Sequence, residues 1–157
     1  MADMDNRWSG IETHRVIFTA QSKTKFYCRD AICEYVFKQE CIPLNPFRAF
    51  EYFLGDRTDR DLIRMGNNNL IRISDELWVF GETIADGVLF EILYAKRLGK
   101  PLRFFTIHDR ADCITELCYS QINFEKEVYK KINESKINIK KMIFGETYSE
   151  YEQTLFD

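Results

Sequence analysis

The amino-acid sequence predicts a three-layer α/β fold, in which a parallel sheet of about four to five strands carries helices on both faces. Short apolar runs alternate along the chain with longer segments of helical spacing, and this alternation is typical of parallel α/β sheets. In the clearest example, an apolar run at 77–80, a helical segment and a second apolar run at 102–105 follow one another. We interpret residues 75–106 as a βαβ unit.

The composition indicates one soluble globular domain. Of the 157 residues, 45% are apolar and 30% are charged, and a net charge of −3 does not favour binding to a nucleic-acid polymer. No apolar run is long enough to span a membrane and no signal peptide is recognisable, so we expect a cytoplasmic protein with no membrane partner. The five cysteines lack metal-ligand spacing and only two histidines are present, so the sequence predicts buried free thiols and no metal site.

The remaining elements follow from the same patterns. Ahead of the βαβ unit, we predict strands at 15–19 and 41–44 and helices at 25–38, 47–54 and 59–73. After it, we predict a loop, a charged amphipathic helix at 121–134, and short helices or an arm at 136–144 and 148–156. In terms of domains, we expect a flexible leader at 1–12, the α/β core at 13–106, and a helical extension at 107–157 that packs on the core or on a partner subunit.

The helix predicted at 59–73 contains the triplet Asn67-Asn68-Asn69, which we expect to interrupt it because asparagine is a poor helix former. Two interpretations stay open: an exposed, slightly strained turn, or a side chain that hydrogen-bonds a ligand. The apolar residues expected to point inward are Leu62, Ile63, Leu70 and Ile73.

Glu91 breaks the pattern of the βαβ unit. The predicted helix at 87–98 turns Val88, Ile92 and Ala95 to one apolar face, and Glu91 lies on that face. A buried carboxylate must be paired or border a cavity, because an unpaired buried charge is unstable. Near the start of a helix its ionised form should be favoured, which makes Glu91 a candidate nucleophile. The alternative is a structural salt bridge to Arg64 or Arg72.

Polar residues follow three of the predicted strands. In parallel sheets, ligands bind outside the carboxyl ends of the strands, so we expect a binding site where these loops converge. None of the loops has the spacing of a phosphate-binding glycine loop, which argues against an ATPase or an NAD enzyme. The candidate residues are Thr19, Gln21, Ser22, Asn45, Gly81, Glu82, Asp86 and Gly87.

Several segments together resemble the nucleoside 2-deoxyribosyltransferase-like superfamily, especially its small bacterial and phage members. They are VIFTA at 16–20, IPLNPF at 42–47, DELWVFG at 75–81 and DGVLFEILYAKRLGKP at 86–101. The resemblance covers residues 14–106 and implies a flavodoxin-like, or Rossmann-like, sheet in a homodimer. It also implies cleavage or transfer of the N-glycosidic bond of a nucleoside or nucleotide, with no metal or organic cofactor. Glu91 matches the family's nucleophile, which forms a covalent glycosyl-enzyme.

The chain departs from the family pattern at two positions. The family's acid or serine six residues before the nucleophile is Ala85 here, and an acid stands one place later, at Asp86. Asn67 stands where the family often has an aspartate that holds the sugar. Asp86 has a competing structural interpretation as the cap of its helix, alone or in a capping box with Thr83. The departures leave open a second function, a non-catalytic nucleotide-binding or sensing module of the same fold.

Overall fold

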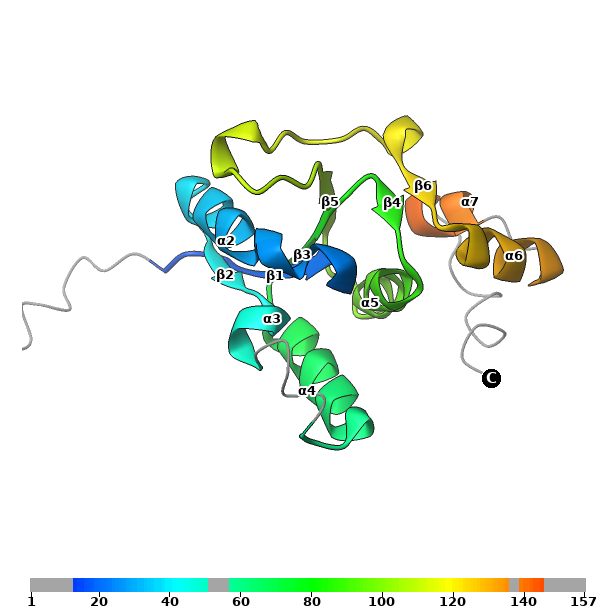
Figure 1. The fold of residues 1–157 in the computed structure, drawn as a ribbon, viewed down its shortest axis with the longest axis horizontal. Helices are drawn as coiled ribbons and strands as arrows, with labels where there is room; N and C mark the ends of the chain where they lie inside the picture. The colour runs from blue at the N-terminus through cyan, green and yellow to red at the C-terminus, as the bar shows by residue number, and fades with distance from the viewer. Residues whose placement is uncertain (1–12, 51–56, 136–138, 146–157) are drawn as a thin grey trace, which may run out of the picture.

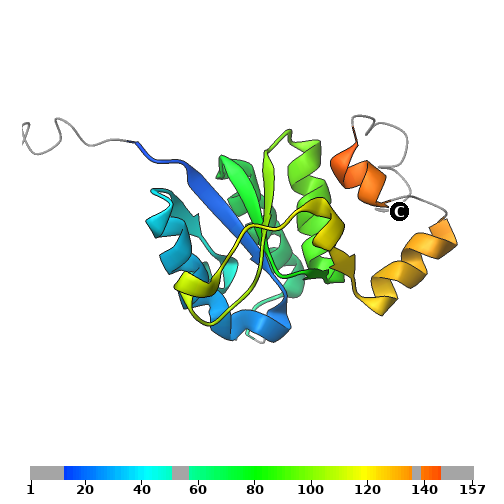
Figure 2. The same cartoon turned by 90° about the horizontal axis from the view of Figure 1, so that it is seen from above.

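The computed structural model describes residues 13–50, 57–135 and 139–145, which form a parallel sheet with helices on both of its faces (Figures 1 and 2). Four strands make the sheet: β1 (Val16–Gln21), β2 (Ile42–Leu44), β3 (Glu76–Phe80) and β5 (Leu102–Phe105). Their order is β2-β1-β3-β5, and every neighbouring pair is parallel. This confirms the predicted α/β class, and the order is that of flavodoxin-like folds.

Alternate residues of the strands face two different cores, because successive side chains of a strand point to opposite faces. On one face, Ile17, Trp78 and Phe105 pack against Ile32 and Val36 of α2 (Arg29–Lys38). β3 is buried along its whole length, which explains why its sequence, ELWVF, is almost continuously apolar.

The opposite face is covered by α5 (Asp86–Arg97) and by part of α4 (Arg60–Ile73). Phe18 and Leu77 of the sheet pack there with Ile92 of α5 and Ile71 of α4. Helix α5 ends just before Gly99, whose φ of 70° suits a glycine and closes the helix.

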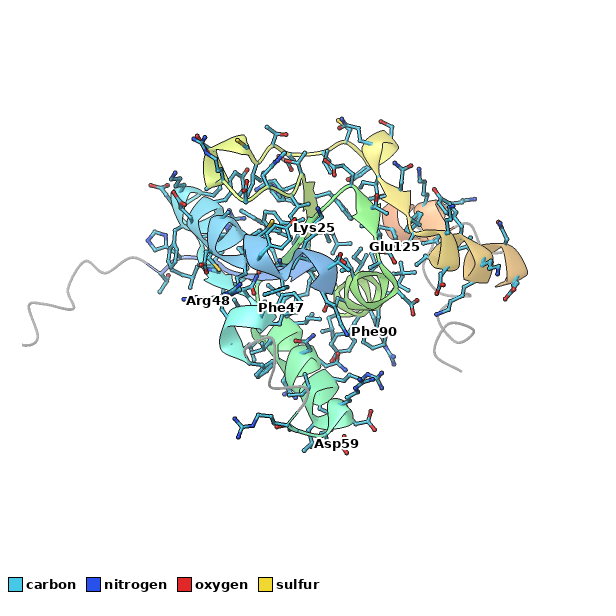
Figure 3. All side chains as sticks on the ribbon, viewed as in Figure 1. Lys25, Phe47, Arg48, Asp59, Phe90 and Glu125 are labelled. Carbon is cyan, nitrogen blue, oxygen red and sulfur yellow. The ribbon has the colours of Figure 1, made fainter. Side chains whose placement is uncertain are left out.

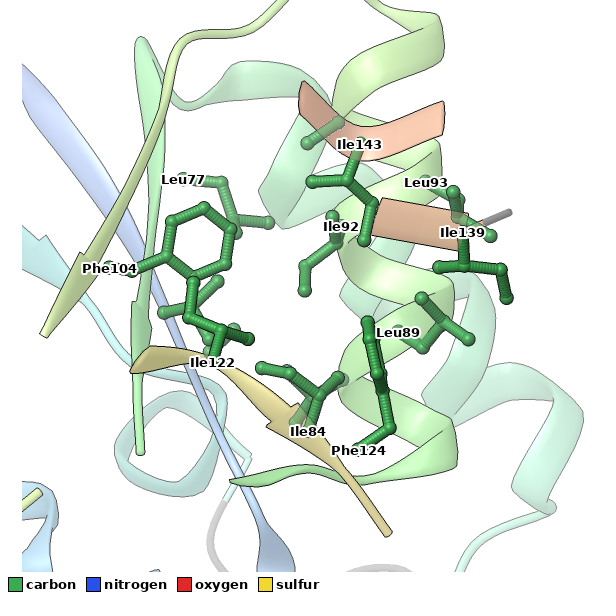
Figure 4. Close-up of a cluster of buried hydrophobic side chains, with 14 of the residues drawn as sticks. Leu77, Ile84, Leu89, Ile92, Leu93, Phe104, Ile122, Phe124, Ile139 and Ile143 are labelled. Atoms are coloured by element: carbon green, nitrogen blue, oxygen red, sulfur yellow. The ribbon is translucent and has the colours of Figure 1, made fainter. Parts of the chain in front are cut away.

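The segment after β5 packs on the outer side of α5. Strand β6 (Asn123–Phe124) pairs with β4 (Thr83–Ile84) in a small parallel sheet, and α6 (Lys126–Ser135) and α7 (Ile139–Phe144) follow. Their buried side chains join the core that α5 shares with the sheet, as Figure 4 shows for Ile122, Phe124, Ile139 and Ile143. The predicted domain boundaries stay predictions.

The structure corrects several predicted elements. The helix predicted at 25–38 is a 3₁₀ helix, η1 (Lys23–Cys28), followed by α2. The turn at 81–86 contains β4, and α6 begins only at Lys126 because the residues before it form β6. Helix α3 (Pro46–Ala49) begins at Pro46, one residue before the predicted start. The rest of the helix predicted at 47–54, and the one at 148–156, extend into residues 51–56 and 146–157, which lie outside the described residues.

Three further predictions were also wrong. Leu62 and Ile73 of α4 are exposed, and Ile71 is the fully buried residue of this helix. The three asparagines lie inside α4 without interrupting it. Of the five cysteines, which are all free, Cys113 and Cys118 are exposed and not buried. Within the described residues, no helix is long and apolar enough to cross a membrane.

Candidate functional site

The polar residues after β1 and β2 bond to one another and to the backbone. Asn45 Nδ2 donates hydrogen bonds to Thr19 Oγ1 and to Gln21 Oε1, each at 2.8 Å, and all three residues are buried. Gln21 Nε2 donates to the carbonyl of Lys25, and Asn45 Oδ1 accepts from the first amides of α3. This network ties β1 to the loop after β2. As ligand contacts, Thr19, Gln21 and Asn45 stay predictions.

Three further candidates hold the backbone. Ser22 caps η1 by accepting from the amide of Thr24. Gly81 has a φ of 121°, which favours glycine, and its amide donates to Phe105 O at 2.8 Å. The carbonyl of Glu82 accepts from the amide of Asn123, which continues the pairing of β4 with β6. Their roles in binding remain predictions.

A cavity of about 540 Å³ lies between α4, α5, α6 and α7. Four of the predicted site residues line it together: Asn67, Asp86, Gly87 and Glu91. The other candidates, at the ends of β1, β2 and β3, are not in its wall. Its volume falls in the range of small-molecule sites in proteins. The wall also contains apolar side chains from three helices: Leu89, Phe90, Leu93, Val128, Ile132 and Ile139. Figure 3 shows Phe90 on α5, near α4.

The carboxyl group of Glu91 is buried with one hydrogen-bond partner among the described residues. Asn67 Nδ2 donates to Glu91 Oε1 at 3.2 Å, whereas Glu91 Oε2 is shielded from solvent and has no partner in the described part of the chain. Asn67 Oδ1 is likewise buried, and none of the described residues bonds to it. Two buried oxygens without a hydrogen-bond partner among the described residues are a local cost in the free protein, because a buried polar atom that lacks a partner is destabilising.

Burial sets the ionisation of Glu91. Desolvation raises its pKa from the ordinary 4.5 to about 8, because the charged form loses its hydration. This direction is opposite to the expectation that the ionised form would be favoured at the helix start, because desolvation favours the neutral form. In the free protein, the carboxyl group is mostly neutral at pH 7.

The predicted alternative, a salt bridge from Glu91 to Arg64 or Arg72, is also wrong. Arg64 pairs with Asp61 at 3.1 Å, and Arg72 donates to Asn69 at 2.6 Å. Within residues 13–50, 57–135 and 139–145, the carboxyl group therefore lacks the cationic partner that would make it a structural ion pair. Of the asparagine triplet, Asn67 and Asn68 line the cavity, whereas Asn69 bonds within α4.

Asp86 does not cap α5 by its side chain, which corrects the capping interpretation. Ala85 occupies the N-cap position, where no side chain accepts a hydrogen bond, and Asp86 is the first helical residue. Instead, Asp86 Oδ2 accepts from Lys131 Nζ of α6 at 2.7 Å. The carboxylate of Asp75 accepts from the Val16 amide at 2.6 Å, at the amino end of β1.

Sequence reasoning missed the part of the cavity wall that α6 and α7 contribute. Lys131 carries the charge on this side, and Val128 and Ile132 supply apolar wall. The four-residue spacing of Val128 and Ile132 indicated an amphipathic helix, but nothing in the sequence indicated which surface it would cover. Within the described residues, no group of three or more His, Cys, Asp or Glu side chains is placed to hold a metal ion.

Comparison with known proteins places this core in a family. Residues 17–105, more than half of the chain, match the family described as Domain of unknown function (DUF7768). The chain belongs to this family. The DUF7768 region runs from β1 to β5 and includes Asn67, Asp86 and Glu91, whereas α6 and α7 come after it.

Two further comparisons concern curated proteins and solved structures. No curated protein matches the chain. Among solved structures, the chain is similar to one described as a 2-desoxiribosyltransferase from Leishmania mexicana, at 21% sequence identity and a TM-score of 0.46. The match covers 59% of this chain and 64% of that one, less than two thirds of its length. At this level of similarity, the match assigns neither an activity nor a substrate to the DUF7768 region.

Proposed function

We propose that the cavity binds a nucleoside or nucleotide and that Glu91 attacks the sugar to cleave or transfer its N-glycosidic bond. One observation carries this proposal: Glu91 lines a cavity of ligand size with a buried carboxyl group that has no cationic partner among the described residues. A desolvated acid in a cleft lowers stability, and such groups are concentrated at functional sites. The apolar side chains of the wall suit a nucleobase and the polar side chains suit a sugar.

The proposed reaction follows the logic of retaining glycosidases. A lone pair of Glu91 forms a bond to C1′ of the sugar while the bond from C1′ to the base nitrogen breaks. The base leaves with that electron pair and takes a proton from water. Water then attacks C1′ and releases the carboxylate, giving hydrolysis, or a second base attacks it, giving transfer.

The raised pKa of Glu91 suits a step that develops positive charge on the sugar. In the free protein the ionised carboxylate is disfavoured by desolvation, and no cationic side chain of the described residues pairs with it. An oxocarbenium-like sugar supplies a positive charge next to the carboxylate in the transition state and not in the ground state. An interaction that strengthens in this way lowers the barrier. The Asn67 amide, which donates to Oε1, orients the carboxyl group.

The test is release of free base from nucleosides and nucleotides, followed by chromatography. We expect wild-type protein to release base and Glu91→Gln to lose at least about a hundredfold in rate, because an amide is a far weaker nucleophile. Glu34→Gln is the matched control, since Glu34 is an exposed helical glutamate whose contact is a surface pair with Lys38. Full activity in Glu91→Gln would contradict the mechanism.

A second candidate function is a non-catalytic module that binds nucleotides. It is favoured by Ala85, which stands where the family pattern has an acid or serine, and by a Glu91 that is mostly neutral at pH 7. A neutral carboxyl group donates a hydrogen bond and is a poor nucleophile. Saturable binding of a nucleotide in calorimetry, with the nucleotide recovered intact after long incubation at pH 9, would support this function over the first.

A further inference from the structure

The cavity contains two cationic side chains in addition to the buried carboxyl group. Arg64 of α4 and Lys131 of α6 both line it. The only other charged side chains in the wall, as far as the described residues go, are Asp86 and Glu91. With Glu91 neutral, the wall carries a net charge of about +1 at pH 7. This charge favours a ligand with an anionic group.

The ionic partners of both cations are exposed. Lys131 Nζ lies 2.7 Å from Asp86 Oδ2, and the two side chains are 60% and 63% exposed. Arg64 and Asp61 are more exposed still. Exposed pairs of this kind contribute little to stability. When a ligand anion binds Lys131 or Arg64, the displaced carboxylate of Asp86 or Asp61 can therefore be hydrated by solvent.

The start of α5 opens onto the same cavity. Its N-cap residue, Ala85, offers no side-chain acceptor to the amides of the first turn. Gly87 lines the cavity, and a Cβ atom at this position would have no neighbour within 4 Å. A ligand anion can therefore approach the backbone of the first turn, where helix amides and the helix dipole favour negative charge. Independently, the unpartnered oxygens of Asn67 and Glu91 indicate a ligand in this cavity.

We propose that the ligand is a phosphorylated nucleoside and that Lys131 is the residue that selects for its phosphate. This rests on the proposed function for the nucleoside part of the ligand. In the complex, Lys131 releases Asp86 and binds the phosphate instead, and Arg64 adds a second positive charge beside it. The sugar lies toward Asn67 and Glu91. Because Lys131 comes from α6, the segment after the DUF7768 match sets the preference for nucleotide over nucleoside.

Isothermal titration calorimetry tests this with the full chain, the four common deoxynucleosides, their 5′-monophosphates, and pyrophosphate as an anion without a nucleoside. We expect wild-type protein to bind at least one monophosphate about tenfold or more tightly than its nucleoside, because hydrogen bonds to a charged phosphate are stronger than those between neutral groups. Lys131→Ala should remove most of that difference and leave nucleoside affinity within about twofold. Lys130→Ala is the matched control, since this neighbouring lysine is exposed and does not line the cavity.

The outcomes separate this inference from the proposed function. Equal binding of nucleoside and monophosphate, or equal effects of Lys131→Ala and Lys130→Ala, overturns the role of Lys131 and leaves the proposed function standing. Binding of pyrophosphate that depends on Lys131, without binding of any nucleoside or monophosphate, supports the anion site and contradicts the proposed function. If none of these compounds binds, both are overturned.

Discussion

At the scale of single residues, the surroundings of the Glu91 carboxyl group are unfavourable for stability. The carboxyl group is desolvated and its Oε2 has no partner among the described residues. The sequence alone singled out Glu91, because an acidic residue interrupts an otherwise apolar helix face. It could not predict the protonation state, which depends on burial of the carboxyl group among helices that lie far apart in the sequence. Tertiary contacts of this kind are not encoded in local spacing.

Replacing Glu91 with glutamine should stabilise the protein at alkaline pH. Because the folded-state pKa of about 8 is above the ordinary 4.5, the folded protein binds more protons than the unfolded chain between these values. The contribution of Glu91 to stability therefore falls as pH rises from about 4.5 to 8. Glutamine does not titrate, so the gain from Glu91→Gln should grow over this window to a few kcal/mol.

Urea unfolding of wild-type protein and Glu91→Gln at pH 5 and pH 9 measures this gain. We expect nearly equal stability at pH 5 and a clear advantage for the variant at pH 9. A variant that is less stable than wild type at both pH values would mean that the carboxylate is a structural group, and the functional interpretation of its burial would fail.

The pH dependence of turnover follows from the same pKa. As a nucleophile, Glu91 must be ionised, so kcat/KM for base release should rise with pH and level off above about 8. Below that pH, the slope should approach tenfold per pH unit. Initial rates between pH 5.5 and 9.5 give the profile. A rate that falls above pH 8 would instead assign Glu91 the role of a general acid.

At the scale of elements, α4 shows why helical spacing predicts a helix better than it predicts its buried face. The helix was expected at 59–73 and is observed at Arg60–Ile73, with Asp59 as its N-cap. Its inward residue is Ile71, since only part of the helix lies on the sheet and the rest extends beyond it (Figure 1). Apolar residues on the extending part, such as Leu62, satisfy the spacing without being buried.

Two neighbouring substitutions test this assignment. Ile71→Ala should cost about 2–5 kcal/mol, because it leaves a cavity in a closed core. Ile73→Ala, two positions away on the same helix, should change the free energy of unfolding by less than about 0.5 kcal/mol, because Ile73 is 65% exposed. Chemical denaturation of both variants gives the comparison. The reverse order would show that α4 packs through another face.

At the scale of the whole molecule, the sheet was predictable and the extension was not. Parallel strands that are buried on both faces produce continuous apolar runs, and these runs located β1, β3 and β5. The pairing of β4 with β6 rests on two-residue strands that lie 40 positions apart, which leave no periodic signal. This pairing leads the chain to α6 on the outer side of α5, and thus decides which residues close the cavity. The homodimer implied by the sequence resemblance stays a prediction.

The central claim, that Glu91 bonds covalently to a sugar, is tested most directly by mass spectrometry of the protein. Incubation with 2′-fluoro nucleosides and nucleotides, whose fluorine slows breakdown of the glycosyl-enzyme, should add one sugar residue to the intact mass. Peptide mapping should place the added mass on Glu91, and Glu91→Gln should remain unmodified. Base release by wild-type protein with the added mass on another residue, or with equal activity in Glu91→Gln, would contradict the account.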